Sequence, residues 1–346
     1  MHLDSRDAGL ASDIVFGTLR RRGQLDAIAG ACSTRPIARL DVEIRIVLEM
    51  AVYQCLFLDR VPDHAVVNDA VELTRRAGKA SAAGFVNAIL RGVMRQVITA
   101  PDEAATPAWL LERWRTEFGP ETTAAIVAAS LAPPRRYIRT GGAEPPPGAV
   151  DTDVFGCHEL PSGDPKAFRF QDIGSQAVVP LLKLEAGQRF LDVCAAPGNK
   201  TAQALETPVR AVACELHPSR AHGLLQLGIP VVVADARVPL PFSVKFDRIL
   251  VDAPCTGTGT LSRNPEIKWR LKPEDITDLQ NRQKAILRNA LDLLAPGGRL
   301  VYSTCSLERE ENDDVVGSCG HAVAETLRRL PGRDPGDGFF AAVICG

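Results

Sequence analysis

The second half of the chain alternates short apolar runs with stretches of helical periodicity, and this alternation limits the folds that it can adopt. Apolar runs typical of buried strands begin near Phe190, Val209, Val231, Phe246 and Leu300. Helices are expected from Lys200 and over residues 273–294, and a last strand over residues 339–343. Strands that alternate with helices favour a parallel sheet covered on both faces. We therefore predict an α/β fold with a doubly wound, Rossmann-like sheet.

Two cysteines stand where two of these strands end. Cys255 closes a DAPC segment at 252–255 and Cys305 lies in an STCS segment at 303–306, each directly after an apolar run. Ligands of open α/β sheets bind outside the carboxyl ends of the strands, so both sulfurs are expected in one crevice. A single cysteine is more often a small buried hydrophobe. The pair, however, indicates covalent catalysis by a thiol.

A third strand end predicts a cofactor site. The segment LDVCAAPGNKT at 191–201 has small residues and glycine where a strand turns into a helix, so a ligand can approach the backbone. Glu215 ends the next strand and can accept hydrogen bonds from both hydroxyls of a ribose, and Asp235, after the third strand, is positioned to meet an adenine. Alone, each feature fits an ordinary turn or a solvated carboxylate. Together they predict a nucleotide-like cofactor held by Cys194, Ala195, Ala196, Pro197, Gly198, Asn199, Lys200, Glu215, Asp235 and Asp252.

The first part of the chain has a different pattern. Apolar residues recur at helical spacing over residues 7–96, with few strand signals. Asp63 is expected to cap a helix over residues 66–76, and a further helix is expected to open at Phe85. A stretch rich in proline and glycine follows. The expected regions are a helical domain at 1–130, a linker or small irregular subdomain at 131–170, and a catalytic domain at 171–346.

The motifs at 191–201, 254–257 (PCTG) and 304–306 (TCS) resemble the Sun-type family of RNA (cytosine-5) methyltransferases, in its bacterial ribosomal RNA branch. The helical part, at 53–62 and 86–91, is similar to the NusB-type RNA-binding bundle. The resemblance implies an all-α, NusB-like RNA-binding domain ahead of a Rossmann-like, S-adenosylmethionine-dependent methyltransferase sheet. It implies methylation of carbon-5 of a cytosine in RNA, with small-subunit (16S) ribosomal RNA expected and transfer RNA the alternative.

The chemistry explains why such a site needs thiols. A thiolate that adds to carbon-6 of cytosine makes carbon-5 nucleophilic enough to take a methyl group. An acid at ring nitrogen N3 would ease this addition, and Asp252 is placed to provide it. The residues alone leave open which cysteine attacks, but the family pattern assigns attack to Cys305 and product release to Cys255. The family has glycine where this chain has Asn199, which is the least costly substitute if the position needs a positive φ.

Several other residues carry weaker indications. Lys200 could neutralise charge near the cofactor or touch the target base, although a lysine at a helix start is commonly solvated. Residues 263–269 are expected to line an RNA cleft, and residues 171–176 to pack beside the cofactor. Phosphate contacts and ordinary solvated charge are equally compatible with the basic side chains of the helical domain. These candidates are Arg20, Arg21, Arg22, Arg75, Arg76, Lys79, Arg91 and Arg95.

Composition limits the partners and the compartment. The net charge is −2, so nucleic-acid binding must come from local patches. Nine cysteines without metal-ligand spacing favour free thiols, no metal and a reducing compartment, which we expect to be the cytoplasm. No secretory signal and no apolar stretch of about 20 residues is found, so no membrane contact is expected. We expect a monomer.

Two rival functions remain open from the sequence. A dinucleotide-dependent oxidoreductase would share the sheet and Glu215 but would not need Cys255 and Cys305. A non-catalytic RNA-binding regulator would keep the basic helices and lose the thiols, whereas this chain retains them.

Overall fold

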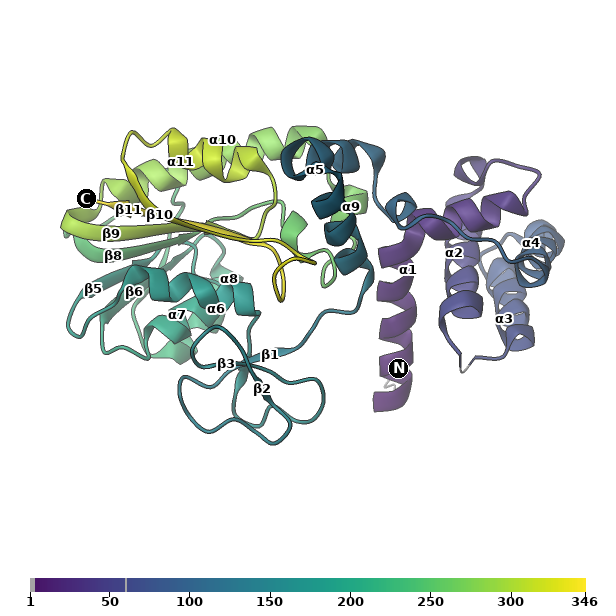
Figure 1. Ribbon diagram of the computed structural model, residues 1–346, viewed down its shortest axis with the longest axis horizontal. Coiled ribbons are helices and arrows are strands. Elements are labelled where there is room, and N and C mark those ends of the chain that lie inside the picture. The colour runs from purple at the N-terminus through teal and green to yellow at the C-terminus, as the bar shows by residue number, and fades with distance from the viewer. Residues whose placement is uncertain (1–3, 60) are drawn as a thin grey trace. The chain divides into compact units, whose positions relative to one another are not determined.

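The computed structural model describes residues 4–59 and 61–346, and the chain divides into two compact units (Figure 1). The first unit runs up to Pro133 and is called the helical unit. The second begins at Pro134 and is called the sheet unit. Each is described below by itself.

The first four α-helices of the helical unit pack around one core. Leu25, Leu48, Val52, Val86 and Leu90 are all buried there, and they recur at helical spacing along their segments. The α-helices are α1 (Ser5–Ala31), α2 (Val42–Phe57), α3 (Asp63–Arg76), α4 (Ala83–Arg95) and α5 (Ala108–Leu131). The short 3₁₀ turns are η1 (Ile37–Arg39), η2 (Ala80–Ala82) and η3 (Asp102–Ala105).

The start of α3 differs from the expected one. The helix begins at Asp63 itself, with Pro62 as the N-cap residue, and the cap position has no side-chain hydrogen bond. The proposed capping role of Asp63 is therefore wrong, because Pro62 already fixes the backbone at the helix entry. The expected helix at Phe85 is found, within α4. Position 60, in the segment similar to the NusB-type bundle, lies outside the described residues.

The proline- and glycine-rich stretch is folded. The strands β1 (Tyr137–Arg139), β2 (Val150–Asp151), β3 (Cys157–Glu159) and β4 (Arg169–Phe170) form an antiparallel sheet in the order β2-β3-β1-β4. The sequence predicted a linker or irregular subdomain here, because strands of two or three residues leave no periodic signal. The sheet unit thus contains a small sheet before its main one.

The main sheet has seven strands in the order β10-β11-β9-β8-β5-β6-β7. Strands β5 to β9 are parallel to one another, as predicted, whereas β11 runs antiparallel to both β9 and β10. The predicted parallel sheet is found in these five strands, and β10 and β11 add an antiparallel edge to it. The strands are β5 (Arg189–Asp192), β6 (Arg210–Glu215), β7 (Val231–Val233), β8 (Phe246–Asp252), β9 (Leu294–Thr304), β10 (Val323–Arg329) and β11 (Phe339–Cys345).

Successive strand residues point to opposite faces, which gives this sheet two cores. Leu191, Ile249 and Leu300 belong to the core under α10 (Pro273–Leu291) and α11 (Asp313–Gly317). Their neighbours Phe190, Leu250 and Val301 belong to the other core. That second face is covered by α6 (Ile173–Val178), η4 (Val179–Leu182) and α7 (Asn199–Ala204), and α8 (Pro218–Leu224) lies on the same side (Figure 1). The remaining short elements are η5 (Leu225–Leu227), η6 (Thr258–Thr260), α9 (Ile267–Arg270) and η7 (Arg309–Glu311).

The strand order reverses between β5 and β8, since β6 and β7 lie on one side of β5 and β8 and β9 on the other. In doubly wound sheets, ligands bind outside the carboxyl ends of the strands at such a switch point. The predicted site residues follow these strand ends.

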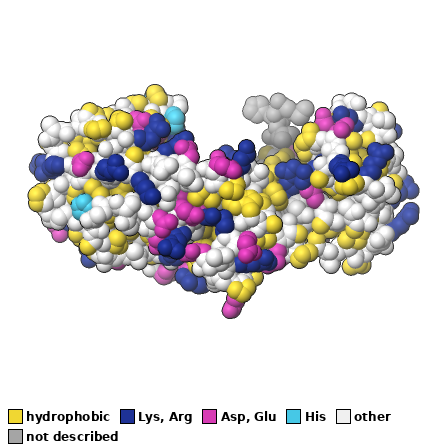
Figure 2. All heavy atoms as spheres, turned by 90° about the horizontal axis from the view of Figure 1, so that it is seen from above, with side chains coloured by type: hydrophobic (Ala, Val, Ile, Leu, Met, Phe, Trp, Pro, Cys, Tyr) yellow, Lys and Arg dark blue, Asp and Glu magenta, His cyan; other side chains and the backbone are white. Residues whose placement is uncertain are grey.

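On the face seen in Figure 2, basic and acidic side chains are interspersed in both units. Within the described residues, no helix is both long and apolar enough to cross a membrane. All nine cysteines are free thiols.

Candidate active site

The turn after β5 is shaped by Gly198. Its φ of +102° lies in the left-handed region that glycine favours, and a Cβ there would come within 2.8 Å of Leu224 Cδ2. Asn199 is the first residue of α7, so the positive φ considered for it falls on Gly198 instead. The Nδ2 of Asn199 lies 3.5 Å from the carbonyl oxygen of Phe170. Gly198 therefore lets the turn after β5 pack closely against Leu224 of α8, and the predicted role of this turn in holding a cofactor stays a prediction.

Glu215, at the end of β6, faces this turn. The carboxylate is buried and accepts hydrogen bonds from the backbone N–H of Ala196 at 3.3 Å and of His217 at 3.1 Å. Arg220 donates to the carbonyl oxygen of Ala196 at 2.9 Å. The end of β6 is thus joined to the turn after β5, as a shared cofactor site requires.

The sequence prediction did not include Asp192, at the end of β5 just before the predicted cofactor turn. Its Oδ2 accepts a hydrogen bond from Thr201 at 2.7 Å, and its Oδ1 is buried with no hydrogen-bond partner among the described residues. Burial raises the pKa of Asp192 to about 7. An unsatisfied acceptor beside the turn at 194–199 and a buried glutamate fits a ligand that carries amino and hydroxyl donors. The signal was available, because Asp192 is the polar residue that ends the β5 run.

Asp235 lies two residues beyond β7 and is engaged elsewhere. Its carboxylate makes a two-pronged pair with Arg237, with Nε–Oδ1 at 2.9 Å and Nη2–Oδ2 at 2.7 Å. Hydrogen bonds from this guanidinium lower the pKa of Asp235. The structure thus joins Asp235 to its own loop, and its predicted contact with an adenine stays a prediction.

Asp252, at the end of β8, forms a polar cluster with α7 and β9. Its Oδ2 lies 2.7 Å from Nζ of Lys200, and its Oδ1 accepts a hydrogen bond from Ser303 at 2.8 Å. Lys200 is buried, with Nζ 5.1 Å from the centre of the Phe339 ring. Lys200 is therefore buried beside Asp252 and is not a solvated lysine at a helix start.

The two predicted cysteines do meet. The sulfurs of Cys255 and Cys305 are 3.4 Å apart, and both side chains are half-buried. The hydrogen bond between them, together with burial, raises the pKa of Cys255 well above its usual value. Burial also raises the pKa of Cys194, in the cofactor turn. The two thiols, the Lys200–Asp252 ion pair and the turn at 194–199 thus lie at the ends of neighbouring strands.

The two further predicted segments, at 263–269 and 171–176, form hydrogen bonds and ion pairs within the sheet unit. The guanidinium of Arg263 lies 3.0 Å from Asp337 and 3.4 Å from Asp172, both buried, so its charge is satisfied within the protein. Burial raises the pKa of Asp172 to about 6. Gln171 donates to the side chain of Gln203 in α7 at 2.9 Å, so the segment at 171–176 packs against α7. That residues 263–269 line an RNA cleft stays a prediction.

The basic candidates of the helical unit are largely engaged in internal contacts. Arg22 pairs with Glu49 at 3.1 Å, and Lys79 pairs with Asp41 at 2.6 Å. Arg21 lies over the ring of Phe57. Arg75 and Arg76 pair with Glu72, and Arg91 donates to Asn87. Their phosphate contacts stay a prediction.

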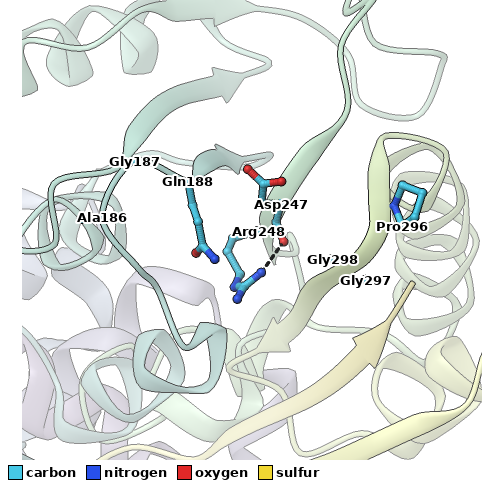
Figure 3. Close-up of a pocket in the computed structure, with 8 residues that line it drawn as sticks. All are labelled: Ala186, Gly187, Gln188, Asp247, Arg248, Pro296, Gly297 and Gly298. Carbon is cyan, nitrogen blue, oxygen red and sulfur yellow. Dashed lines mark hydrogen bonds between the residues drawn. The ribbon is translucent and has the colours of Figure 1, made fainter.

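The amino edge of the same sheet offers a contrast (Figure 3). A hollow of about 470 Å³ lies there, lined in part by Gln188, Asp247 and Arg248 and by the glycines of β9. Arg248 donates to the backbone carbonyl oxygens of Asp247 and Lys183, so its guanidinium is occupied. Throughout the described residues, no group of three or more histidine, cysteine, aspartate or glutamate side chains could hold a metal ion. The chemistry-bearing groups lie instead at the carboxyl edge.

Comparison with known proteins agrees with this geometry. Residues 179–319 match the 16S rRNA methyltransferase RsmB/F family, and residues 1–95 match the NusB family. In fold, the chain is similar to the crystal structure of PH0851, with a TM-score of 0.79 and 21% identity over 99% of this chain and 90% of that one. It is also similar to NSun6 from Pyrococcus horikoshii, with a TM-score of 0.62 and 20% identity over 69% of this chain and 98% of that one.

Curated relatives extend the match over both units. The probable ribosomal RNA small subunit methyltransferase B of Bacillus subtilis is 30% identical over 91% of this chain and 80% of its own length. The ribosomal RNA small subunit methyltransferase B of Salmonella paratyphi B is 32% identical over 98% of this chain and 90% of its own length. The chain therefore belongs to the ribosomal RNA small subunit methyltransferase B family, and it is an RNA methyltransferase that uses S-adenosylmethionine as methyl donor.

Proposed function

We propose that the chain methylates carbon-5 of a cytosine in small-subunit ribosomal RNA through a covalent cysteine adduct. The observation that supports this is the 3.4 Å separation of the Cys255 and Cys305 sulfurs, on strand ends next to Asp252. Carbon-5 of cytosine is a weak nucleophile and needs covalent activation, whereas a ring or amino nitrogen would not need two thiols. Family membership removes the two rival functions, the oxidoreductase and the non-catalytic regulator.

The cofactor would lie against the turn at 194–199, with Glu215 at its ribose and Asp192 near its amino group. S-adenosylmethionine supplies an electrophilic methyl group when bound. Gly198 lets this turn pack against Leu224 without a side chain of its own, and Glu215 is already oriented by the backbone N–H groups of Ala196 and His217. Asp235 is proposed to meet the adenine, which would require a rearrangement of its pair with Arg237.

Activation of the base begins with addition. The target cytosine must leave any base stack to reach the crevice. The Cys305 thiolate forms a bond to carbon-6, and the electron pair of the carbon-5–carbon-6 double bond moves to carbon-5. A carboxylate can only accept hydrogen bonds, so the proton offered to ring nitrogen N3 comes from the ammonium group of Lys200. Its Nζ lies 2.7 Å from Oδ2 of Asp252. Proton transfer of this kind contributes about 10²- to 10⁴-fold to a rate.

Release reverses the addition. Once carbon-5 carries the methyl group, its proton passes to water and the electron pair of that C–H bond re-forms the carbon-5–carbon-6 double bond. The bond between carbon-6 and the Cys305 sulfur breaks, the sulfur leaves as a thiolate, and any proton taken up by N3 returns to Lys200. Cys255, in hydrogen-bond contact with Cys305, is placed to assist this step. The two thiols should therefore have opposite phenotypes.

The test replaces each thiol and follows both methylation and the adduct. Cys305→Ala should abolish methyl transfer and yield no adduct with RNA. Cys255→Ala should allow methyl transfer but slow release, so that a protein–RNA adduct survives denaturing gel electrophoresis. Cys345→Ala, which removes an exposed thiol in β11, is the matched control and should behave like the unmodified protein.

The outcomes separate the alternatives. An adduct in the Cys305 variant and none in the Cys255 variant would reverse the two roles. Full activity in both variants would rule out covalent catalysis. Bisulfite mapping of ribosomal and transfer RNA from a deletion strain would then identify the modified nucleotide.

A further inference from the structure

A single carboxylate lies beneath both cysteine loops. Glu311, the last residue of η7, is 0% exposed. Its Oε1 accepts hydrogen bonds from the backbone N–H of Thr256 and from Nε2 of Gln283, each at 2.9 Å. Its Oε2 accepts from Oγ1 of Thr256 at 2.5 Å and from Oγ of Ser306. Four donors thus converge on one buried side chain.

These donors flank the two thiols. Thr256 directly follows Cys255, and Ser306 directly follows Cys305. Gln283 comes from α10 and also donates to the carbonyl oxygen of Pro254, at 2.8 Å, on the other side of Cys255. Glu311 therefore joins the loop after β8, the loop after β9 and a helix that covers the sheet.

The position of Glu311 is itself fixed by β9. The hydroxyl of Tyr302 donates to the carbonyl oxygen of Glu311 at 2.7 Å. The next residue, Asn312, donates from Nδ2 to the carbonyl oxygen of Ser306 at 2.9 Å and accepts from the hydroxyl of Thr304 at 2.5 Å. The strand that delivers Cys305 thus also sets where the carboxylate stands.

Burying this carboxylate is unfavourable, since its hydrogen-bond partners are all uncharged. Well-packed apolar residues in place of the carboxylate and its donors together would commonly give a fold equal or greater stability. Stability alone therefore does not account for the arrangement. A group that accepts four hydrogen bonds from two loops can, in contrast, hold those loops in one relative position.

We propose that Glu311 is a positioning residue that sets the separation of the Cys255 and Cys305 sulfurs by bonding to the residue after each of them. The inference rests on the proposed function, because the separation matters only if both thiols act on one base. Glu311 contacts neither the turn at 194–199 nor Glu215 among its hydrogen bonds. Its loss should lower the rate of the chemical steps and leave cofactor affinity unchanged.

A pair of variants of similar size separates geometry from charge. In Glu311→Gln, the amide oxygen can accept the bonds from Thr256 N–H and Gln283, and the amide NH₂ can donate to the two hydroxyls, which then rotate to accept. Glu311→Leu keeps the volume and loses all four bonds. We expect Glu311→Gln to keep most of the single-turnover methylation rate. We expect Glu311→Leu to lose about 100-fold, the effect of an ångström of misplacement.

Three readouts accompany the rate for each full-length variant. Thermal unfolding checks the fold, calorimetry with S-adenosylmethionine checks the cofactor site, and RNA containing 5-fluorocytidine traps the cysteine adduct. The adduct should form more slowly in Glu311→Leu, with the KM for RNA unchanged. If Glu311→Leu does not fold, Ser306→Ala removes one of the four bonds and should slow adduct formation by about 10-fold, a smaller displacement of the same loop.

The proposal is overturned by a folded Glu311→Leu protein that methylates at the normal rate, or by Ser306→Ala that does so when Glu311→Leu does not fold. It is also overturned if Glu311→Gln loses as much as Glu311→Leu, since the charge and not the geometry would then be needed. Failure of the unmodified protein to form an adduct would instead count against the covalent mechanism.

Discussion

Each unit of this molecule buries a glutamate, and the two carboxylates are held in opposite ways. In the helical unit the side chain of Glu49 is 5% exposed and lies 3.1 Å from Nε of Arg22 and 2.9 Å from Nε of Arg45. In the sheet unit Glu311 receives its hydrogen bonds from hydroxyl and amide groups. Burial is the largest cause of a raised pKa in both.

The difference indicates what each carboxylate is for. Two arginines neutralise Glu49 and connect α1 with α2, which is a purely structural arrangement. A guanidinium in this position would also stabilise Cys255 as a thiolate, although the proposed mechanism takes Cys305 as the attacking thiolate. The uncharged partners of Glu311 avoid this, and its charge adds to the Cys305 hydrogen bond and to burial in raising the pKa of Cys255. Carboxylates of the sheet unit should therefore affect chemistry and pH response, and Glu49 should affect stability.

The largest effect is expected at Asp192, whose hydrogen bond comes from the uncharged Thr201. Its pKa is about 7 in the folded protein against 3.8 for the free group, so the folded state holds a proton more tightly. The stability that this proton contributes is complete below pH 3.8 and is lost as the pH rises through 7. Asp192→Asn lacks this loss. The measurement is urea unfolding without cofactor. The free energy of unfolding of Asp192→Asn, minus that of the unmodified protein, should rise by about 4 kcal/mol from pH 4 to pH 8. Parallel pH profiles would contradict the assignment.

The next effect concerns Glu215. Glu215→Ala removes an acceptor placed for two ribose hydroxyls, and hydrogen bonds to a charged group contribute about 1.5–3 kcal/mol each. Calorimetry should show S-adenosylmethionine affinity reduced at least tenfold, with urea unfolding showing that the sheet unit still folds. Glu215→Gln, which keeps an acceptor for the N–H of Ala196, should lose less. Equal affinity in all three proteins would remove Glu215 from the cofactor site.

A smaller effect is expected from Glu49→Leu. Removing one partner of a fully buried ion pair is strongly destabilising, but the arginine side chains are 25% and 28% exposed and can turn to water. We expect a loss of about 2 kcal/mol in the free energy of unfolding of the helical unit. The methylation rate per folded molecule at saturating RNA should stay unchanged. If Glu49→Leu keeps its stability and loses activity, the conclusion that Glu49 is purely structural, in contrast to Glu311, is wrong.

The smallest effect is expected where a pair is exposed. The side chain of Arg237 is 45% exposed and that of Asp235 is 30% exposed. Exposed pairs contribute about 0–1 kcal/mol, so Arg237→Ala should change the free energy of unfolding by less than about 1 kcal/mol. Urea unfolding at two salt concentrations measures this. A loss as large as that of Glu49→Leu would show that exposure does not separate the two pairs.

The sequence predicted those site residues that follow directly after an apolar run in the chain. Cys255 and Cys305 could be placed because each follows an apolar run, and strand ends of a doubly wound sheet share one edge. Glu311 could not be found this way, since its partners Thr256 and Gln283 lie 55 and 28 residues away. Long-range hydrogen bonds of this kind have no periodic pattern in the chain.

The fold shows the same limit. Strand β10 was missed because it lies at the sheet edge, where Glu325, Arg328 and Arg329 interrupt the apolar pattern that identifies buried strands. The antiparallel edge follows from β10 and β11 together, and only β11 has a continuous apolar run. Lys200 was undervalued because its ion pair joins residues 52 positions apart.

The 3.4 Å between the two sulfurs also makes the site sensitive to oxidation. A disulfide needs sulfurs about 2.05 Å apart, so a small movement of either loop would suffice. A hydroperoxide would take two electrons and two protons from the thiols, leaving a disulfide, water and an alcohol. The thiols proposed for attack and for release would be consumed at once, and thiol exchange with a reductant would restore them. Activity lost to peroxide and recovered with dithiothreitol would make the redox state of the cell a condition for methylation.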